Sequence, residues 1–488
     1  MDTKHLIAAA LIFIFTGMGV LAASCSQRLR DLMFFMLVAG TSVAERMSVN
    51  FWSQDNYRGT SRGLEVSGID LLAVSVLVAC VLLPRAGQRR WFWPAGLTAM
   101  GCFGAYCLGS VLLSQPKLFG AFELWKLLRG LVFFLATALY VRSPRELKIL
   151  VFGLVCAVGF EALIAYRQRL FEGMVRAQGH LNHPNSLSMY LCLIGPVLVA
   201  GAAAVGFPQW LRRACLIAVV MTAGAMILTL SRTGVVSFAL VVLAATAFCV
   251  PWRLTFKKVA VGCTVLAMVA LVLVSSWQPL MARFNESTLS EEYLESGEGR
   301  GIYLRWAGMI VADHGWGIGL NNWSYWVSKV YGAREGLNYE DYDASRNLVD
   351  RTERFPGYYA APAHNLGALL LGELGVLGLL LFTLLWLRWF QVGAGFLWRG
   401  STDPMQLLGV GVFFGFCGVF LQSLTEWTYR HSPIFITFHI LAGALAGLHY
   451  YWQTQKKAAR VESSTRWAEP EIPERFGPAV VGVEVRSS

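Results

Sequence analysis

Charged residues are scarce in this sequence. Asp, Glu, Lys and Arg make up 15% of its 488 residues, whereas hydrophobic residues make up 56%. Soluble domains carry about 25% charged residues. A membrane-spanning helix needs roughly 20 consecutive apolar residues, and the runs Val259–Trp277 and Leu366–Leu387 meet that length. The deficit of charge therefore argues against a soluble globular protein and predicts an all-α, polytopic membrane protein.

The sequence also lacks a basic patch interleaved with aromatic residues, which is the pattern typical of nucleic-acid binding. The formal net charge of +11 has a simpler source in a membrane protein, because cytoplasmic loops are rich in Lys and Arg. We therefore expect membrane lipid, and no nucleic acid, among the partners of this protein.

No CxxC pair occurs among the ten cysteines, and most of them lie inside apolar runs. Zinc sites and disulfide frameworks need suitably spaced cysteines, so we expect these residues to pack as small apolar side chains. His180 and His183 have i, i+3 spacing, but no nearby carboxylate or cysteine in the sequence completes a metal site. The sequence thus predicts neither a metal site nor another cofactor.

A convincing internal repeat is lacking as well. Secondary transporters are commonly built from such repeats, so this absence counts against a transporter. A nucleotide-binding fingerprint is missing too, because the glycines of DHGWGIGLNNW follow no expected strand and lack the later glycine.

Apolar segments divide the chain into about 12 transmembrane helices, or 13 if the short segment 32–44 also spans. With 13 helices Met1 lies outside; with 12, segment 32–44 is re-entrant or interfacial and both ends lie inside. The other helices are expected at residues 5–23, 69–84, 95–113, 121–141, 147–165, 186–205, 213–230, 234–251, 259–277, 365–387, 406–424 and 433–452.

Lys and Arg in the short loops follow every second span from Arg85 onward, and this bias marks the cytoplasmic face. The opposite, periplasmic face then receives one large loop, 278–363. We expect residues 1–452 to form a single membrane domain that includes this loop. Residues 453–488 are expected to form a cytoplasmic tail, disordered from Lys456 onward because its charged composition offers little to bury.

The periplasmic segment before residue 186 concentrates polar side chains, among them Arg176, His183 and Asn185. These residue types could bind an anionic or sugar ligand. Alternatively, Asn185 simply caps the helix that Pro184 begins.

Two further arginines are candidate ligand-binding residues. Arg232 lies between two long apolar spans, where an arginine is costly unless it reaches the head groups or faces a water-filled cavity. Its planar donor fork suits a phosphate. Arg300 lies in the large loop, where a solvated loop charge is the alternative reading.

His364 stands next to Asn365 at the start of an apolar run. An imidazole with a pKa near neutral can accept a proton from a bound hydroxyl, although a histidine at an interface is more often a structural hydrogen-bonding group. Glu373 lies nine residues later, on roughly the opposite face of the expected helix. We therefore expect Glu373 to pair with another span, and we leave the roles of Glu161 and Glu426 open.

Four segments, in this order and flanked by apolar spans, resemble the O-antigen ligase / Wzy-type polymerase superfamily. The resemblance covers about residues 165–450, and residues 1–164 match only as generic spans. The segments are GHLNHPNSLSMYLCLIGP, LTLSRTGVVSFAL, GRGIYLRWAGMIVADHGWGIGLNNW and AHNLGALLLGELGVLGLLLF.

This resemblance implies a metal-independent, inverting glycosyltransferase with a GT-C-like fold in the bacterial inner membrane. The donor would be a glycan on undecaprenyl diphosphate, and the acceptor the lipid A core or another glycan. Arg176 and Arg232 would hold the diphosphate, Arg300 would assist there, and His364 would act on the acceptor hydroxyl. His183, Asn185 and Asn365 would complete the substrate site.

Ligase and polymerase, whether for O-antigen or exopolysaccharide, are not separated by these motifs. A transporter of lipid-linked glycans is an alternative of another class, and it predicts charges at the membrane midplane and repeat symmetry. A structural subunit of an envelope assembly is a third, and it predicts that His364 can be replaced without loss of glycan.

Overall fold

A computed structural model describes residues 3–54, 56–85, 88–251, 301–335, 359–398 and 403–466, with six isolated positions between 267 and 281. These residues are mostly helical and confirm an α-helical membrane fold in its coarse outline. The expected span 259–277, most of the large loop and residues 467–488 lie outside the described part of the chain.

The long helices follow the apolar runs closely. They are α1 (Thr3–Cys25), α2 (Gln27–Ala39), α3 (Gly68–Leu82), α4 (Leu97–Leu113), α5 (Lys117–Tyr140), α6 (Pro144–Leu170), α7 (Pro184–Ala203), α8 (Gln209–Leu228), α9 (Arg232–Cys249), α16 (Leu366–Ala394), α17 (Pro404–Ser423) and α18 (Ser432–Arg466). The shorter elements are η1 (Thr41–Val43), β1 (Ser48–Ser53), β2 (Gly63–Ser67), α12 (Gly301–Asp313), α13 (Trp323–Trp326), η2 (Val327–Tyr331), α14 (Gly332–Arg334) and η3 (Thr428–Arg430).

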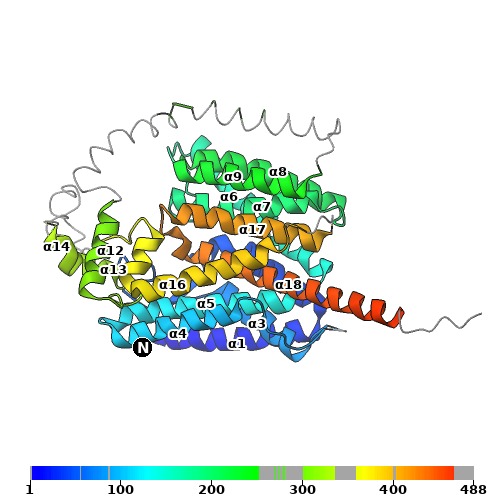
Figure 1. Ribbon diagram of the computed structural model, residues 1–488, viewed down its shortest axis with the longest axis horizontal. Coiled ribbons are helices and arrows are strands. Elements are labelled where there is room, and N and C mark those ends of the chain that lie inside the picture. Colours follow the sequence, from blue (N-terminus) through cyan, green and yellow to red (C-terminus); the bar gives the residue numbers. More distant parts are fainter. Residues whose placement is uncertain are drawn as a thin grey trace, which may run out of the picture.

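The long helices lie side by side along one axis, with α12, α13 and α14 together at one end (Figure 1). We call this end, which also carries β1 and β2, the loop end. α7 packs against α8, α9 and α17, and α5 packs against α18. Eight of the described helices are long and apolar enough to cross a membrane, and α3 and α4 are shorter apolar helices.

The opposite end, which we call the basic end, gathers arginines from the short loops. Arg85 forms an ion pair with Asp31, and Arg145 approaches the same carboxylate at 2.9 Å. Arg142 donates a hydrogen bond to the carbonyl oxygen of Arg89. These arginines come from loops that the sequence assigned to one face, and the structure brings them together.

The first two helices form an antiparallel pair that returns the chain to the loop end. The ring of His5, near the start of α1, lies 6.0 Å from that of Phe51 in β1, and α2 has only 13 residues. The start of α1 therefore lies at the same end as the β-hairpin, which is the arrangement that the 13-helix alternative requires.

Two features differ from the expectations drawn from the sequence. The polar loop before α3 contains the antiparallel strands β1 and β2, where only a loop was expected. At the C-terminus, α18 continues to Arg466, so the first residues of the expected disordered tail are helical. Helix extension is physically reasonable there, because Lys, Arg, Glu and Ala dominate this stretch and are good helix formers.

A break in α16 lets the loop after α12 approach the helix closely. Gly375 has φ 67° inside α16, and a side chain there would meet the backbone of Trp316 at 2.7 Å. The N–H groups of Ile318 and Gly319 donate to carbonyls of the preceding turn at 3.1 and 2.8 Å, and the Tyr106 hydroxyl donates to another at 2.7 Å. The loop and α4 thus satisfy backbone groups that the break leaves open, as a membrane interior requires.

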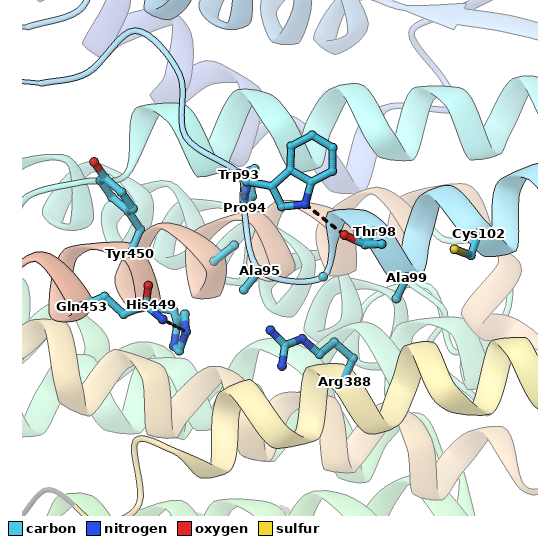
Figure 2. Close-up of a pocket in the computed structure, with 12 residues that line it drawn as sticks. Trp93, Pro94, Ala95, Thr98, Ala99, Cys102, Arg388, His449, Tyr450 and Gln453 are labelled. Atoms are coloured by element: carbon cyan, nitrogen blue, oxygen red, sulfur yellow. Dashed lines mark hydrogen bonds between the residues drawn. The ribbon is translucent and has the colours of Figure 1, made fainter.

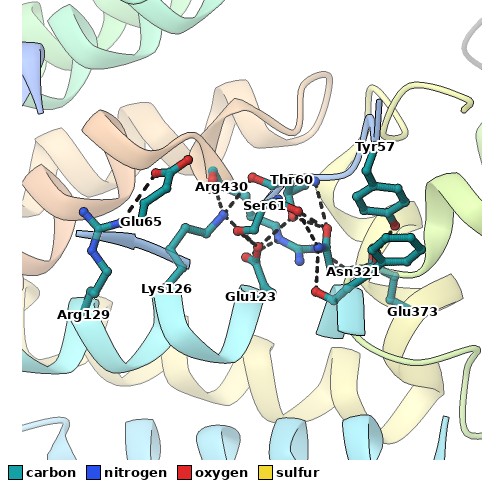
Figure 3. Close-up of polar contacts among 11 residues, drawn as sticks. Tyr57, Thr60, Ser61, Glu65, Glu123, Lys126, Arg129, Asn321, Glu373 and Arg430 are labelled. Carbon is teal, nitrogen blue, oxygen red and sulfur yellow. Dashed lines mark hydrogen bonds and ion pairs between the residues drawn. The ribbon is translucent and has the colours of Figure 1, made fainter. Parts of the chain in front are cut away.

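Four buried charges form one network between α5, α16 and η3 (Figure 3). Nε of Arg430 donates to Glu123 at 3.0 Å, and Nη1 donates to Glu373 at 2.6 Å. Nζ of Lys126 lies 2.8 Å from Glu123. All four residues are at most 4% exposed, so each charge depends on its partners rather than on water. Glu373 was expected to pair with another span; its partner is instead Arg430 in η3, the short connection between α17 and α18.

The same network anchors the loop of the β-hairpin. Thr60 donates through its hydroxyl to Glu123 at 2.9 Å, and its carbonyl accepts from Lys126 at 3.1 Å. Asn321, which is fully buried, donates to the carbonyl oxygens of Ser61 and Phe119 at 2.9 and 2.8 Å. Segments from distant parts of the sequence are therefore held to one another by polar contacts beneath the loop end.

Replacing Arg430 with Met should destabilise the protein by about 3–5 kcal/mol, because two buried carboxylates lose their shared cation. Arg145→Met is the matched control: Arg145 is 60% exposed in its ion pair, and such pairs contribute about 0–1 kcal/mol. Thermal unfolding and yield of monodisperse protein in detergent measure both effects. If the two variants lose the same amount of thermal stability, the buried network does not stabilise the protein as proposed.

Candidate functional site

Four polar side chains are linked in a row at the loop end, and we call them the polar chain: Arg176, Asn185, Glu426 and His364. Nη2 of Arg176 donates to Oδ1 of Asn185 at 3.0 Å. Nδ2 of Asn185 donates to Oε1 of Glu426 at 2.7 Å. Oε2 of Glu426 lies 2.8 Å from Nδ1 of His364. Three residues selected from the sequence are thus brought together by a fourth, Glu426.

The start of α7 positions Asn185. Pro184 occupies the first turn, and His183 is the N-cap, with its Nδ1 accepting a hydrogen bond from the Asn185 N–H at 3.2 Å. The alternative in which Asn185 itself caps the helix is therefore wrong. Because His183 fills that role, the amide of Asn185 is available to bridge Arg176 and Glu426.

The start of α16 positions His364. Asn365 is the N-cap of this helix, and its Oδ1 accepts from the Ala368 N–H at 2.8 Å. Its Nδ2 donates to the carbonyl oxygen of Leu424 at 2.9 Å. Asn365 therefore ties α16 to the end of α17, next to Glu426. These contacts give Asn365 a helix-capping role, and its contact with substrate stays a prediction.

Arg176 contacts the turn between α8 and α9, and Arg232 directly follows this turn. Arg176 donates from Nε to the carbonyl oxygen of Thr229 at 3.1 Å, and Arg232 is the first residue of α9 after this turn. Both side chains are half-buried. The site therefore combines the fixed guanidinium group of Arg176 with one carboxylate and one imidazole, and the backbone of Arg232 lies next to the turn that Arg176 contacts.

Close packing of α7 against α9 brings this turn to the polar chain. A side chain at Gly234, in the first turn of α9, would collide with the hydroxyl of Ser188 in α7. Ser188 in turn donates to Oε1 of Gln422 near the end of α17 at 3.1 Å. Helices α7, α9 and α17 therefore converge beneath the four residues.

Other charged residues of the expected large loop form pairs of their own where the structure describes them. Arg300 belongs to the part of the chain that the structure does not describe. Arg305 pairs with Glu335 at 3.0 Å on an exposed surface. Asp313 pairs with Arg334 at 2.6 Å, and the hydrogen bond from this guanidinium lowers the pKa of Asp313.

His180 is engaged away from His183. Its backbone N–H and Nδ1 contact the two oxygens of the buried Glu161, at 2.9 and 3.2 Å. Glu161 therefore holds the segment before α7 in place. No group of three His, Cys, Asp or Glu side chains suited to a metal occurs in the described ranges.

The polar chain can hold a neutral imidazole ready to accept a proton. The contact between Nδ1 of His364 and the Glu426 carboxylate favours the tautomer with hydrogen on Nδ1, which leaves the Nε2 lone pair as acceptor. Glu426 is 4% exposed, and the His364 side chain is 31% exposed. A buried anion thus orients a ring that a ligand can reach.

Glu426 is the residue whose role sequence reasoning missed. It stands at the end of a span, and the sequence left its role undecided. A polar residue inside or bordering a membrane helix is a functional candidate, but its partner His364, just before α16, lies 62 positions away. Sequence spacing contains no signal for such a contact.

Asn365→Ala should lower thermal stability by about 1 kcal/mol, because it removes an N-cap and the link to Leu424. Asn365→Ser keeps a cap acceptor and should recover part of the loss. Asp403→Ala removes a comparable cap, which accepts from the Met405 N–H, at the start of α17. Thermal unfolding in detergent compares the three variants, and an unaffected Asn365→Ala protein would contradict the capping role.

Comparison with known proteins supports the resemblance seen in the sequence. Residues 217–383 match the family model described as O-antigen ligase. Three of the four motif segments lie within this range, together with Arg232, His364 and Asn365, while Arg176 and Asn185 precede it. No curated protein matches the chain significantly. The match over residues 217–383 therefore supports the similarity of this part of the chain to the O-antigen ligase / Wzy-type superfamily.

Proposed function

We propose that this multi-pass membrane protein is an O-antigen ligase-like glycosyltransferase. It moves a glycan from undecaprenyl diphosphate to an acceptor sugar on the periplasmic side of the bacterial inner membrane. The observation that carries the proposal is the polar chain, which joins a fixed arginine to an oriented imidazole through Asn185 and Glu426. The O-antigen ligase match supports the same reaction class.

Arg176 and Arg232 hold the diphosphate of the donor in this proposal. Guanidinium forks bind phosphate oxygens bidentately and stay charged. Fixed positive charge is most effective where negative charge develops in the transition state, which here is the departing diphosphate. Arg300, from the large loop, assists at the same group. These cations and a good leaving group supply the activation that a metal would otherwise provide.

His364 takes the proton of the acceptor hydroxyl at Nε2. The acceptor oxygen attacks the anomeric carbon from the side opposite the phosphate, and the bond between that carbon and the phosphate oxygen breaks. Undecaprenyl diphosphate leaves with the electron pair, and the configuration is inverted. Glu426 stabilises the imidazolium through Nδ1 and keeps the ring in position.

His183 and Asn185 border the same space from the start of α7, and Asn365 borders it from the start of α16. Asn185 acts mainly by setting the distance between Arg176 and Glu426. His183 and Asn365 keep the two helix starts in register, so contacts to substrate from these two residues are secondary in this proposal.

The acceptor is either the lipid A core or another lipid-linked glycan. The polar chain suits both a ligase and a Wzy-type polymerase of O-antigen or exopolysaccharide, because both reactions use the same donor chemistry. Deletion of the gene distinguishes them. Loss of all capped lipid A indicates a ligase, caps reduced to a single repeat indicate a polymerase, and loss of a secreted polymer indicates exopolysaccharide synthesis. Unchanged surface and secreted glycans would overturn the proposal.

His364→Ala should reduce glycan transfer by a factor of about 10²–10⁴, the usual contribution of a general base, while the protein still inserts. His314→Ala is the matched control, because His314 is exposed at the same end and lies outside the polar chain. Transfer from purified undecaprenyl-diphosphate glycan is measured for both. Full activity of His364→Ala would exclude the proposed base.

Arg232→Lys should weaken use of the donor, because it keeps the charge but loses the bidentate fork. Loss of one charge-assisted contact should decrease kcat/KM about tenfold. Arg334→Lys, in an exposed pair with Asp313, serves as control. If both variants have the kcat/KM of the unmodified protein, Arg232 does not bind the diphosphate and serves only as an anchor at the membrane interface.

A further inference from the structure

A cavity lies at the basic end, far from the polar chain. Its volume is about 490 Å³, and the start of α4, the last third of α16 and α18 line it. Figure 2 shows the guanidinium group of Arg388 pointing from α16 into this space, with His449 and Gln453 of α18 beside it and Trp93 across it.

Arg388 brings a positive charge that no carboxylate of the cavity balances. Its Nη1 donates to the neutral amide oxygen of Gln391 at 2.7 Å, one turn further along α16. Neither Asp nor Glu occurs among the described residues that line the cavity. The electrostatic potential inside is therefore positive, because an amide dipole offsets only part of a full charge.

The remaining polar groups are arranged around this charge. Nε2 of Gln453 and Nε2 of His449 lie 2.8 Å apart. Across the cavity, Nε1 of Trp93 donates to the hydroxyl of Thr98 at 3.0 Å, which fixes the indole at the mouth. Trp93 is 66% exposed, so its ring lies on the outer surface of the protein beside the cavity.

The residues around the cavity are typical of the lipid head-group region. The cavity is contiguous with the arginines of the basic end, because the Arg142 guanidinium lies 5.1 Å from the ring of Phe92, and Phe92 stacks at 4.0 Å on Tyr450 of the cavity wall. Exposed Trp91 and Trp93 are typical of a membrane–water interface. Basic pockets between membrane helices on the cytoplasmic side bind anionic head groups.

We propose that this cavity binds the phosphate group of an anionic phospholipid, with Arg388 as the charged ligand and Gln453, His449 and Trp93 around the head group. The guanidinium fork matches two phosphate oxygens. The site is separate from the polar chain, so it does not depend on the proposed transfer reaction and would anchor a lipid of the cytoplasmic leaflet between α4, α16 and α18.

The test compares the full chain with Arg388→Gln in lipid nanodiscs of phosphatidylcholine with or without phosphatidylglycerol. Native mass spectrometry measures the phosphatidylglycerol that remains bound. We expect the unmodified chain to retain it and Arg388→Gln to retain about tenfold less, the effect of losing one charge-assisted contact. Arg213→Gln is the matched control, since Arg213 is exposed at the start of α8 and does not line the cavity.

A parallel measurement separates lipid from soluble phosphate. Thermal unfolding is recorded with inorganic phosphate and with chloride at equal ionic strength. Stabilisation by phosphate that requires Arg388, without retained phosphatidylglycerol, assigns the site to a soluble phosphate compound. If Arg388→Gln and Arg213→Gln behave alike in both measurements, the proposal is overturned.

Gln453→Glu gives a second variant that leaves Arg388 in place. It has nearly the same shape and adds one negative charge to the cavity wall, so it should release phosphatidylglycerol while phosphatidylcholine binding stays constant. Retention of phosphatidylglycerol by a folded Gln453→Glu protein would contradict the site as well.

Discussion

The double ion pair of Arg430 is the interaction on which the loop end depends. One guanidinium group contacts Glu123 of α5 and Glu373 of α16, with all three residues buried. A buried charge that loses its partner strongly destabilises a protein. Separation of α5, α16 and η3 would therefore greatly reduce the stability of the fold. Thr60 and Asn321 extend the arrangement to the β-hairpin and to the loop after α12.

The same arrangement sets the geometry of the polar chain. Glu426 lies four residues before Arg430, on the short connection between α17 and α18. α16 carries Glu373 and begins directly after His364 and Asn365. When Arg430 binds Glu373, it fixes this connection against α16, and Glu426 reaches the ring of His364 at 2.8 Å. The ring of His364 and the buried network are therefore linked through one connection of only a few residues.

Apolar runs predicted the helices well, because a membrane helix must satisfy its own backbone and therefore leaves a continuous signal. Motif positions also predicted that Arg176, Asn185 and His364 serve one site. The strands β1 and β2 were missed because a short polar hairpin has little hydrophobic alternation. The role of Glu426 and the partners of Glu123 and Lys126 were missed because these contacts join residues far apart in sequence, where spacing carries no information. Only Glu373 indicated, by its isolation in a span, that a partner existed.

The buried network also constrains how the protein is made. Glu123 and Lys126 on α5 contact Arg430, whose position is 307 and 304 residues later in the chain. During synthesis Glu123 therefore has only Lys126 as a charged partner until Arg430 has been made. The part of the network that contains Arg430 can form only after the connection between α17 and α18 has been made. Final closure of the bundle is consequently a late, C-terminal event, and nascent chains that stop before residue 430 should be substrates for membrane quality control.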